Sequence, residues 1–432
     1  MDFKLPYLHL PLIASVTALT MAVLTGGIRR AFSSPIGISL ALLTVWIILA
    51  IPFSFWKGGS VEFVVDLWSK SFLSYVMVAG LIKTTKQCRR AAYSIALGIL
   101  VVAILALYFR FTIEDGRLGL PLGMLTNPND LAQVILIGMP LWLLMITIRS
   151  GLLLQRIFAA LCVAPLLLVL FKTGSRAGLV TFALLSVLTF VRVSLPNKLK
   201  VICAVLIIAC VCYPLLPRSL RERYMTVFSD QTAIEQTSAL ESKQERLDLL
   251  ITSLKLTFRH PLFGVGPGQF EPAAAADAKA NRTFAHWRET HNVYTQVSSE
   301  AGIPAMLFYI AAMVYCFKEI GFVRKLGGRI REQDRATRGV GSFYDTDAHA
   351  RLSRYCDDVT TTAFCVGLSL ISFFVFAWFS STAYHFFFPT LAGLTAALGK
   401  AARTELNLVV GESSARVKFA AQPLRLRESV TV

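Results

Sequence analysis

The sequence predicts an all-α, polytopic transmembrane helical bundle of about 11–12 spans, with a small, mostly helical loop domain on one face. Composition is the first reason: 55% of the 432 residues are apolar and only 16% are charged, far from the balance of a soluble globular protein. The second is that the apolar residues fall into runs of helical length, and a hydrocarbon core of ~30 Å needs ~20 such residues per span. The third is aromatic usage, because 30 Phe against 12 Tyr indicates rings that pack and face lipid.

Eleven apolar segments reach the length of a span. Backbone N–H and C=O groups cannot stay unpaired in lipid, so each segment is expected to be helical. The segments cover residues 8–25, 36–56, 61–82, 91–111, 129–148, 153–171, 177–193, 199–217, 292–319, 359–379 and 384–400.

Basic residues cluster in four of the connections between these segments, and basic connections stay cytoplasmic. Counting spans between the clusters places all four on the same side of the membrane. This pattern accounts for the net charge of +17 without a nucleic-acid partner. The clusters are Lys83, Lys86, Arg89 and Arg90; Arg149 and Arg156; Arg192, Lys198 and Lys200; and the eight Arg and Lys of residues 321–358.

The same count places residues 112–128, 172–176 and 218–290 on the periplasmic face. It also puts the N-terminus outside and Arg29 and Arg30 inside, although a second short or re-entrant helix within residues 1–60 would restore an internal N-terminus.

We therefore divide the chain into an N-terminal transmembrane bundle (1–217), a large periplasmic loop domain (218–290), C-terminal transmembrane helices (291–402) with the basic cytoplasmic loop 321–358, and a cytoplasmic tail (403–432) expected to be poorly ordered. The loop domain has a helical apolar pattern from Leu247 to Phe258, a glycine-rich turn at 264–268 and then an Ala-rich stretch. It is expected to form a helical cap over a membrane cavity.

Lys172 and Arg176 lie in the very short periplasmic turn 172–178, where a base must be paired or face a water-filled site. Snorkelling of Arg176 to the headgroups is the alternative. Arg246 begins the apolar helical pattern of the loop domain, and a solvated position is its simplest explanation. His291 opens a span, and its ordinary pKa of ~6.5 suits proton exchange near neutral pH. Asn127 to Asp130 are typical of a turn with a helix N-cap, and Asn129 is a weaker candidate for donor binding.

Motifs for nucleotides and metals are absent from the sequence. There is no Walker loop, dinucleotide fingerprint, HExxH or zinc-type Cys/His spacing. On the outer face the nearest approach to an acidic metal cluster is the adjacent pair Glu114 and Asp115. The eight Cys lie in spans or in connections assigned to the cytoplasm, which argues against disulfides. A reaction without cofactor, metal or nucleotide is therefore favoured.

Three stretches taken together resemble the O-antigen ligase and polymerase family of bacterial envelope glycosyltransferases. They are Thr173-Gly-Ser-Arg-Ala-Gly178; Arg246 followed by His260-Pro-Leu-Phe-Gly-Val-Gly-Pro-Gly-Gln-Phe270; and His291-Asn-Val-Tyr-Thr-Gln-Val-Ser-Ser-Glu-Ala-Gly302. The turn from Asn127 to Asp130 is also similar to this family. The resemblance covers residues 120–320 well, and the first hundred residues only by hydropathy.

The resemblance implies transfer of a glycan from undecaprenyl pyrophosphate to a sugar hydroxyl of lipid A-core, in the inner membrane of a Gram-negative bacterium and at its periplasmic face. Arg176 and Arg246 would bind the pyrophosphate and stabilise its developing charge in place of a metal. His291 would accept the proton of the attacking hydroxyl or orient the phosphate, and direct attack predicts inversion. The expected contacts to pyrophosphate or glycan are Lys172, Ser175, Asn129, Asn292 and Tyr294.

Three other functions stay open. An O-antigen polymerase would use the same donor with a second lipid-linked glycan as acceptor, and a protein O-oligosaccharyltransferase would use Ser or Thr of a periplasmic protein. A secondary transporter is less favoured. Its best evidence is the pair Asp66 and Lys70 inside the third segment, for which a local ion pair is the simpler interpretation.

Overall fold

The computed structural model describes residues 10–113, 116–192, 198–199, 214, 217–225, 233–282, 287–338 and 346–420. Over these residues the protein is a bundle of helices without a strand, and one isolated bridge joins Thr112 to Leu118. The predicted all-α fold class is confirmed. In chain order the α-helices are α1 (Leu10–Leu24), α2 (Gly27–Phe32), α3 (Pro35–Ala50), α4 (Lys57–Phe63), α5 (Ser69–Leu81), α6 (Thr85–Phe109), α7 (Pro128–Thr147), α8 (Leu153–Lys172), α9 (Arg176–Arg192), α11 (Arg218–Met225), α12 (Ala233–Arg259), α13 (Phe270–Ala280), α14 (Val293–Arg338), α15 (Thr346–Phe376) and α16 (Phe387–Ala420).

Seven helical segments of the described chain are long and apolar enough to cross a membrane, so the protein is a multi-pass membrane protein. Ten of the eleven predicted spans coincide with helices, and the segment 199–217 lies outside the described residues apart from 199, 214 and 217. With 15 residues, α1 is shorter than a full span. The seven segments are Pro35–Phe53, Lys57–Leu81, Thr85–Phe109, Pro128–Thr147, Leu153–Lys172, Val293–Glu332 and His349–Phe376.

Residues 355–360 of α15 contact residues in or beside each of the basic clusters. Arg149 and Arg331 both pair with Asp357, at 2.6 Å and 2.7 Å. Arg192 donates to the Thr360 carbonyl at 3.4 Å, and Thr85, beside the first cluster, lies 3.3 Å from the Tyr355 hydroxyl. The prediction that the four clusters share one side is confirmed by these contacts; that this side is cytoplasmic stays a prediction.

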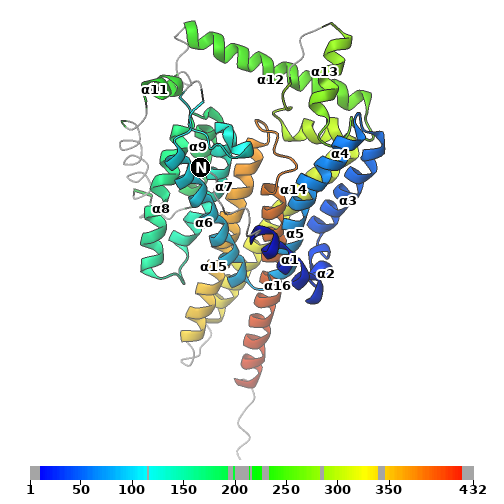
Figure 1. Cartoon of the computed structure of the whole chain (residues 1–432). Helices are drawn as coiled ribbons and strands as arrows, with labels where there is room; N and C mark the ends of the chain where they lie inside the picture. Colours follow the sequence, from blue (N-terminus) through cyan, green and yellow to red (C-terminus); the bar gives the residue numbers. More distant parts are fainter. Residues whose placement is uncertain are drawn as a thin grey trace, which may run out of the picture.

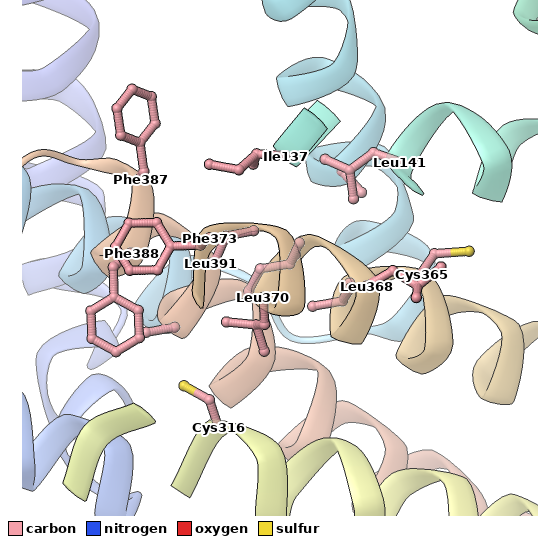
Figure 2. Packing of buried hydrophobic residues seen from close by; sticks show 14 of the residues in the cluster. Ile137, Leu141, Cys316, Cys365, Leu368, Leu370, Phe373, Phe387, Phe388 and Leu391 are labelled. Atoms are coloured by element: carbon pink, nitrogen blue, oxygen red, sulfur yellow. The ribbon is translucent and has the colours of Figure 1, made fainter. Parts of the chain in front are cut away.

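The buried core runs along the axis of the bundle, away from the end where the basic clusters meet. Figure 2 shows aromatic rings of α15 and α16 packed together, with aliphatic side chains of α7 and α15 along the same layer. Phe373 and Phe388 stack with ring centroids 5.6 Å apart and are both fully buried. The Cys residues of the described chain, 88, 162, 316, 356 and 365, are buried and unlinked. Such packing fixes the ends of α7, α14 and α15 relative to one another.

The loop domain crosses the other end of the bundle (Figure 1). There α12 lies across the spans and packs on α13 through a small apolar core that includes Leu256 and Phe270. The expected helical cap is therefore confirmed in its helical character. Its glycine-rich turn bonds to α14: the N–H groups of Val265 and Gly266 donate to the carbonyls of Ser299 and Glu300, both at 2.8 Å.

Three details differ from the sequence prediction. The third predicted span is α4 and α5 joined by a π-helical segment, Val64–Trp68, because one extra residue is accommodated there. A short helix, α2, separates α1 from α3. The tail expected after Arg403 begins as a continuation of α16, which runs to Ala420.

Candidate functional site

A strap of residues 287–292 leads from the loop domain into α14 and carries His291. The His291 backbone has φ of 51°, a conformation that residues other than glycine seldom adopt. Its N–H donates to the Ser381 hydroxyl at 2.8 Å, in the connection between α15 and α16. Strained conformations held by specific contacts are concentrated at functional sites, which supports His291 as a site residue.

Basic groups of the loop domain surround this histidine. Arg288 pairs with Glu245 of α12 at 2.9 Å, which ties the helix that carries Arg246 to the strap. Burial, with smaller contributions from the guanidinium groups of Arg246 and Arg288, lowers the pKa of His291 from 6.5 to about 4. The imidazole is therefore neutral at neutral pH, and a neutral ring keeps one nitrogen free to accept a proton.

Carboxyl groups also lie near the strap. Although part of the Glu289 surface reaches solvent, desolvation by the surrounding protein and the nearby Glu271 raise its pKa to about 6. Asp130, in the first turn of α7, is close enough for its charge to interact with that of Glu289. Among the described residues no three His, Cys, Asp or Glu side chains come together as a metal site, and Glu114 and Asp115 lie outside the described residues.

The turn from Lys172 to Arg176 is held by a buried arginine, Arg117. Its Nε donates to the Thr173 carbonyl and its Nη2 to Asn129 Oδ1, both at 2.9 Å. One guanidinium thus joins the 112–118 loop, the turn before α9 and the start of α7. This fixes the backbone from which Arg176 projects as the first residue of α9.

Helix α7 connects that turn with the His291 strap. Gly178, two residues after Arg176, packs near Ala132 of α7. One residue further along α7, Gln133 donates to the Thr382 hydroxyl at 3.2 Å, next to Ser381, which holds the His291 backbone. The first turns of α7 therefore join the turn before Arg176 to the connection that holds His291, and the Arg288–Glu245 pair brings the helix of Arg246 to the same end of the bundle.

Three predicted binding residues have structural bonds to their side-chain oxygens. Ser175 Oγ accepts the Gly178 N–H at 3.1 Å and caps α9. Asn292 Oδ1 accepts the N–H groups of Tyr294 and Thr295 at 2.9 Å and 3.1 Å and caps α14. Asn129 Oδ1 accepts from Arg117, as described above. Their amide or hydroxyl hydrogens could still meet a ligand, so the predicted contacts of these residues stay predictions.

Tyr294 and Lys172 have different surroundings. The Tyr294 ring is half-buried and packs against Trp378, with centroids 5.1 Å apart, in the turn that follows α15. Lys172 lines a pocket of about 510 Å³ between the ends of α6 and α8, together with Arg110, Leu107 and Leu168. The lining of this pocket includes neither Arg176 nor His291.

Sequence reasoning missed Arg117, Arg288, Glu289, Asp130 and Ser381. Glu289 and Arg288 lie two and three residues before His291, and this proximity could have drawn attention to them. Arg117 and Ser381 had no such signal, because their partners are 56 and 90 residues away in the chain.

Comparison with known proteins finds a match to one family model. Residues 132–310 match the family model described as O-Antigen ligase. A search of curated proteins finds no significant match to the chain. The matched segment begins in α7 and ends in α14, and it contains Arg176, Arg246 and His291.

Proposed function

Because residues 132–310 match the family model described as O-Antigen ligase, we propose that this chain is an O-antigen ligase acting at the end of the bundle that carries His291. In this proposal the chain moves a glycan from undecaprenyl pyrophosphate to a sugar hydroxyl of lipid A-core, at the periplasmic face of a Gram-negative inner membrane. The observation that carries it is that His291, kept neutral by burial, lies close enough to Arg246 and Arg288 for their charges to act on it, in a chain that spans a membrane.

The leaving group defines the role of the arginines. As the bond between the anomeric carbon and the pyrophosphate oxygen breaks, negative charge grows on the phosphate. Guanidinium groups stay protonated and offer paired donors to phosphate oxygens. Arg176 and Arg246 would bind that group and stabilise the charge, and Arg288 is a third candidate because it also lies near His291.

His291 would accept the proton of the attacking acceptor hydroxyl. A ring with a pKa of about 4 is neutral and able to accept, although it is a weak base. The alternative within the site is Glu289, with a pKa of about 6. Direct attack by the hydroxyl on the anomeric carbon, with departure of the pyrophosphate, inverts the configuration. The reaction needs no nucleotide in this scheme, and the arginines act where other transferases use a metal.

The acceptor is the least constrained part of the proposal. A polymerase or a protein O-oligosaccharyltransferase would share the donor site and differ only in what approaches His291. Transport has lost its main sequence evidence, because Asp66 and Lys70 form the expected local pair, at 3.3 Å.

The test is transfer in proteoliposomes that contain the undecaprenyl pyrophosphate donor and lipid A-core, with chelator and without nucleotide. Wild type is expected to form product, and His291→Ala, Arg176→Ala and Arg246→Ala are expected to lose at least ~10²-fold. The controls are His260→Ala and Arg282→Ala, which remove exposed residues of the same types from the same domain.

The outcomes separate the parts of the proposal. Product only with a peptide or a second lipid-linked glycan would retain the family chemistry and replace the acceptor. Full activity of the three site variants would refute the assigned site. Dependence on added divalent metal would refute the role given to the arginines. If kcat/KM falls on the acid side with a midpoint near pH 6 and not near pH 4, Glu289 and not His291 is the base.

A further inference from the structure

The membrane-spanning segment Lys57–Leu81 carries charged side chains on an exposed face. Lys70 Nζ and Asp66 Oδ1 form an ion pair at 3.3 Å, with 71% and 66% of the two side chains exposed. Glu62, one turn before Asp66, is exposed as well. This segment has a mean hydropathy of 1.2, the lowest of the seven candidate spans.

Contacts on the buried face establish the depth of the ion pair. Trp68, which lies between the two charged residues, donates from Nε1 to the Thr44 hydroxyl at 3.2 Å. Thr44 is in the middle of α3 (Pro35–Ala50). At the loop-domain end Ser60 donates to the Pro267 carbonyl at 3.0 Å, and at the opposite end Tyr75 donates to the Ala31 carbonyl at 2.7 Å. The pair therefore lies about midway between the two ends of a span.

The π-helical segment Val64–Trp68 contains the first of these charges. Its extra residue lets Val64 and Trp68 stay buried while Val65 and Asp66 face outward. Such single-turn bulges within helices are frequent at functional sites. Ionisable residues at this depth almost always face a bundle interior or a water-filled cavity and not lipid. A surface of the single chain is thus polar where the bilayer is least polar.

We propose that this face of α4 and α5 is an interface with a second copy of the chain, in which Asp66 of each copy pairs with Lys70 of the other. The ion pair is neutral and self-complementary, since acid and base lie one turn apart. A two-fold axis along the membrane normal would bring the acid of one copy beside the base of the other with little change in depth. Ser69, small and exposed between them, permits close approach of two helices. This inference does not depend on the proposed transferase function.

Charge reversal tests the pairing directly. Asp66→Lys makes both positions basic and Lys70→Asp makes both acidic, so neither variant can pair with itself. Each is expected to lower the recovery of dimers from native membranes by roughly tenfold or more, measured by co-purification of two differently tagged copies. Co-expression of D66K with K70D is expected to restore mixed pairs. The double variant D66K/K70D, which exchanges the two charges, is expected to pair as wild type does.

Arg259 and Asp277 provide a matched control, because they form an ion pair outside the spans. R259D and D277R are expected to leave dimer recovery unchanged. Thermal unfolding of each purified variant checks folding. If a reversal variant fails to fold, D66N/K70Q and oxidative cross-linking of S69C in a background without the native Cys replace it. Dimers between S69C copies support the interface.

Three results would overturn the proposal. One is the absence of wild-type pairs in native membranes. Another is co-expression of D66K with K70D that yields no more pairs than either alone. The third is recovery of a different membrane protein bound at this face, which would show that the occupant is not a second copy. Loss of pairing without loss of transfer, or the reverse, keeps this inference separate from the proposed function.

Discussion

Replacing Arg117 should loosen the turn that presents Arg176. The Arg117 side chain is buried, with 8% of the residue exposed, and it gives one hydrogen bond to Thr173 and one to Asn129. Hydrogen bonds from a charged donor contribute ~1.5–3 kcal/mol each. Arg117→Met keeps the apolar stem, removes both bonds and leaves two acceptors without this donor. The expected loss is about 3 kcal/mol or more in the free energy of unfolding.

Arg117→Lys separates charge from geometry. An ammonium group retains the positive charge but cannot reproduce the fork that reaches two acceptors. About half of the effect is therefore expected, roughly 1.5 kcal/mol. Arg110→Met is the matched control, since Arg110 lies in the same connection and is exposed. Substitutions of exposed residues usually change the free energy of unfolding by less than ~0.5 kcal/mol.

Thermal unfolding in lipid nanodiscs and hydrogen exchange of residues 112–118 and 172–178 measure the effect. Exchange in these two segments should accelerate together in Arg117→Met, because one guanidinium holds both. Under the proposed function, kcat/KM should also fall by ~10–100-fold through misplacement of Arg176. Unchanged exchange and unfolding in Arg117→Met would refute the role assigned to the buried arginine.

Three further predictions concern backbone strain, a single hydrogen bond and pH. Gly302→Ala should destabilise the protein by several kcal/mol, about 3 or more, because Gly302 has φ of 85° and an added Cβ would overlap the Leu262 carbonyl; Gly98→Ala, with open space around it, should be neutral or slightly stabilising in the same thermal assay. Ser381→Ala should lower the free energy of unfolding by ~1 kcal/mol through loss of the bond to the His291 N–H. The control Ser94→Ala, on an exposed part of α6, should leave it unchanged. Equal Tm values for the two variants would contradict this. Between pH 6.5 and about 4 the unfolded chain binds a proton at His291 that the folded chain does not, so this group lowers stability as pH falls; His385 acts in the same direction and Glu289, with its raised pKa, in the opposite one. His291→Gln should therefore lose less stability than wild type from pH 7 to pH 4 in urea titrations, and an identical loss would show that His291 does not titrate as described.

The spans could be predicted from sequence because hydropathy is a local property. A run such as residues 129–148 must be helical in lipid whatever surrounds it, and α7 (Pro128–Thr147) follows the run within one residue at each end. The π-helical segment at Val64–Trp68 was not predictable in this way. It depends on Trp68 reaching Thr44 of α3, a contact between two spans.

The candidate site was partly predictable for the same physical reason. Arg246 and His291 were grouped through the family resemblance, and the pair of Glu245 with Arg288 brings their two segments together in the structure. Lys172 was grouped with Arg176 by sequence spacing alone. In the structure Lys172 lines a pocket whose lining does not include Arg176, because residues four apart on either side of a helix end can project in different directions.

The glycine-rich turn at residues 264–268 explains how the helix that carries Arg246 is held near the strap that carries His291. Gly264, Gly266 and Gly268 all have positive φ, and none contributes a side chain that could react. Gly264 lies against the backbone of Glu300, and the Gly268 N–H donates to the buried Glu300 carboxyl at 3.0 Å. A side chain at Gly264 would separate the turn from α14.

The turn therefore acts on chemistry through position. The turn holds the end of α12 against α14 and so keeps the helix that carries Arg246 near the strap that carries His291. The Arg288–Glu245 pair is a second anchor, near the middle of α12. Two anchors at different positions along one helix restrict its rotation and tilt more than either does alone. A phosphate bound by Arg246 would thus stay at a constant distance from the proton acceptor, which transfer in a single step requires.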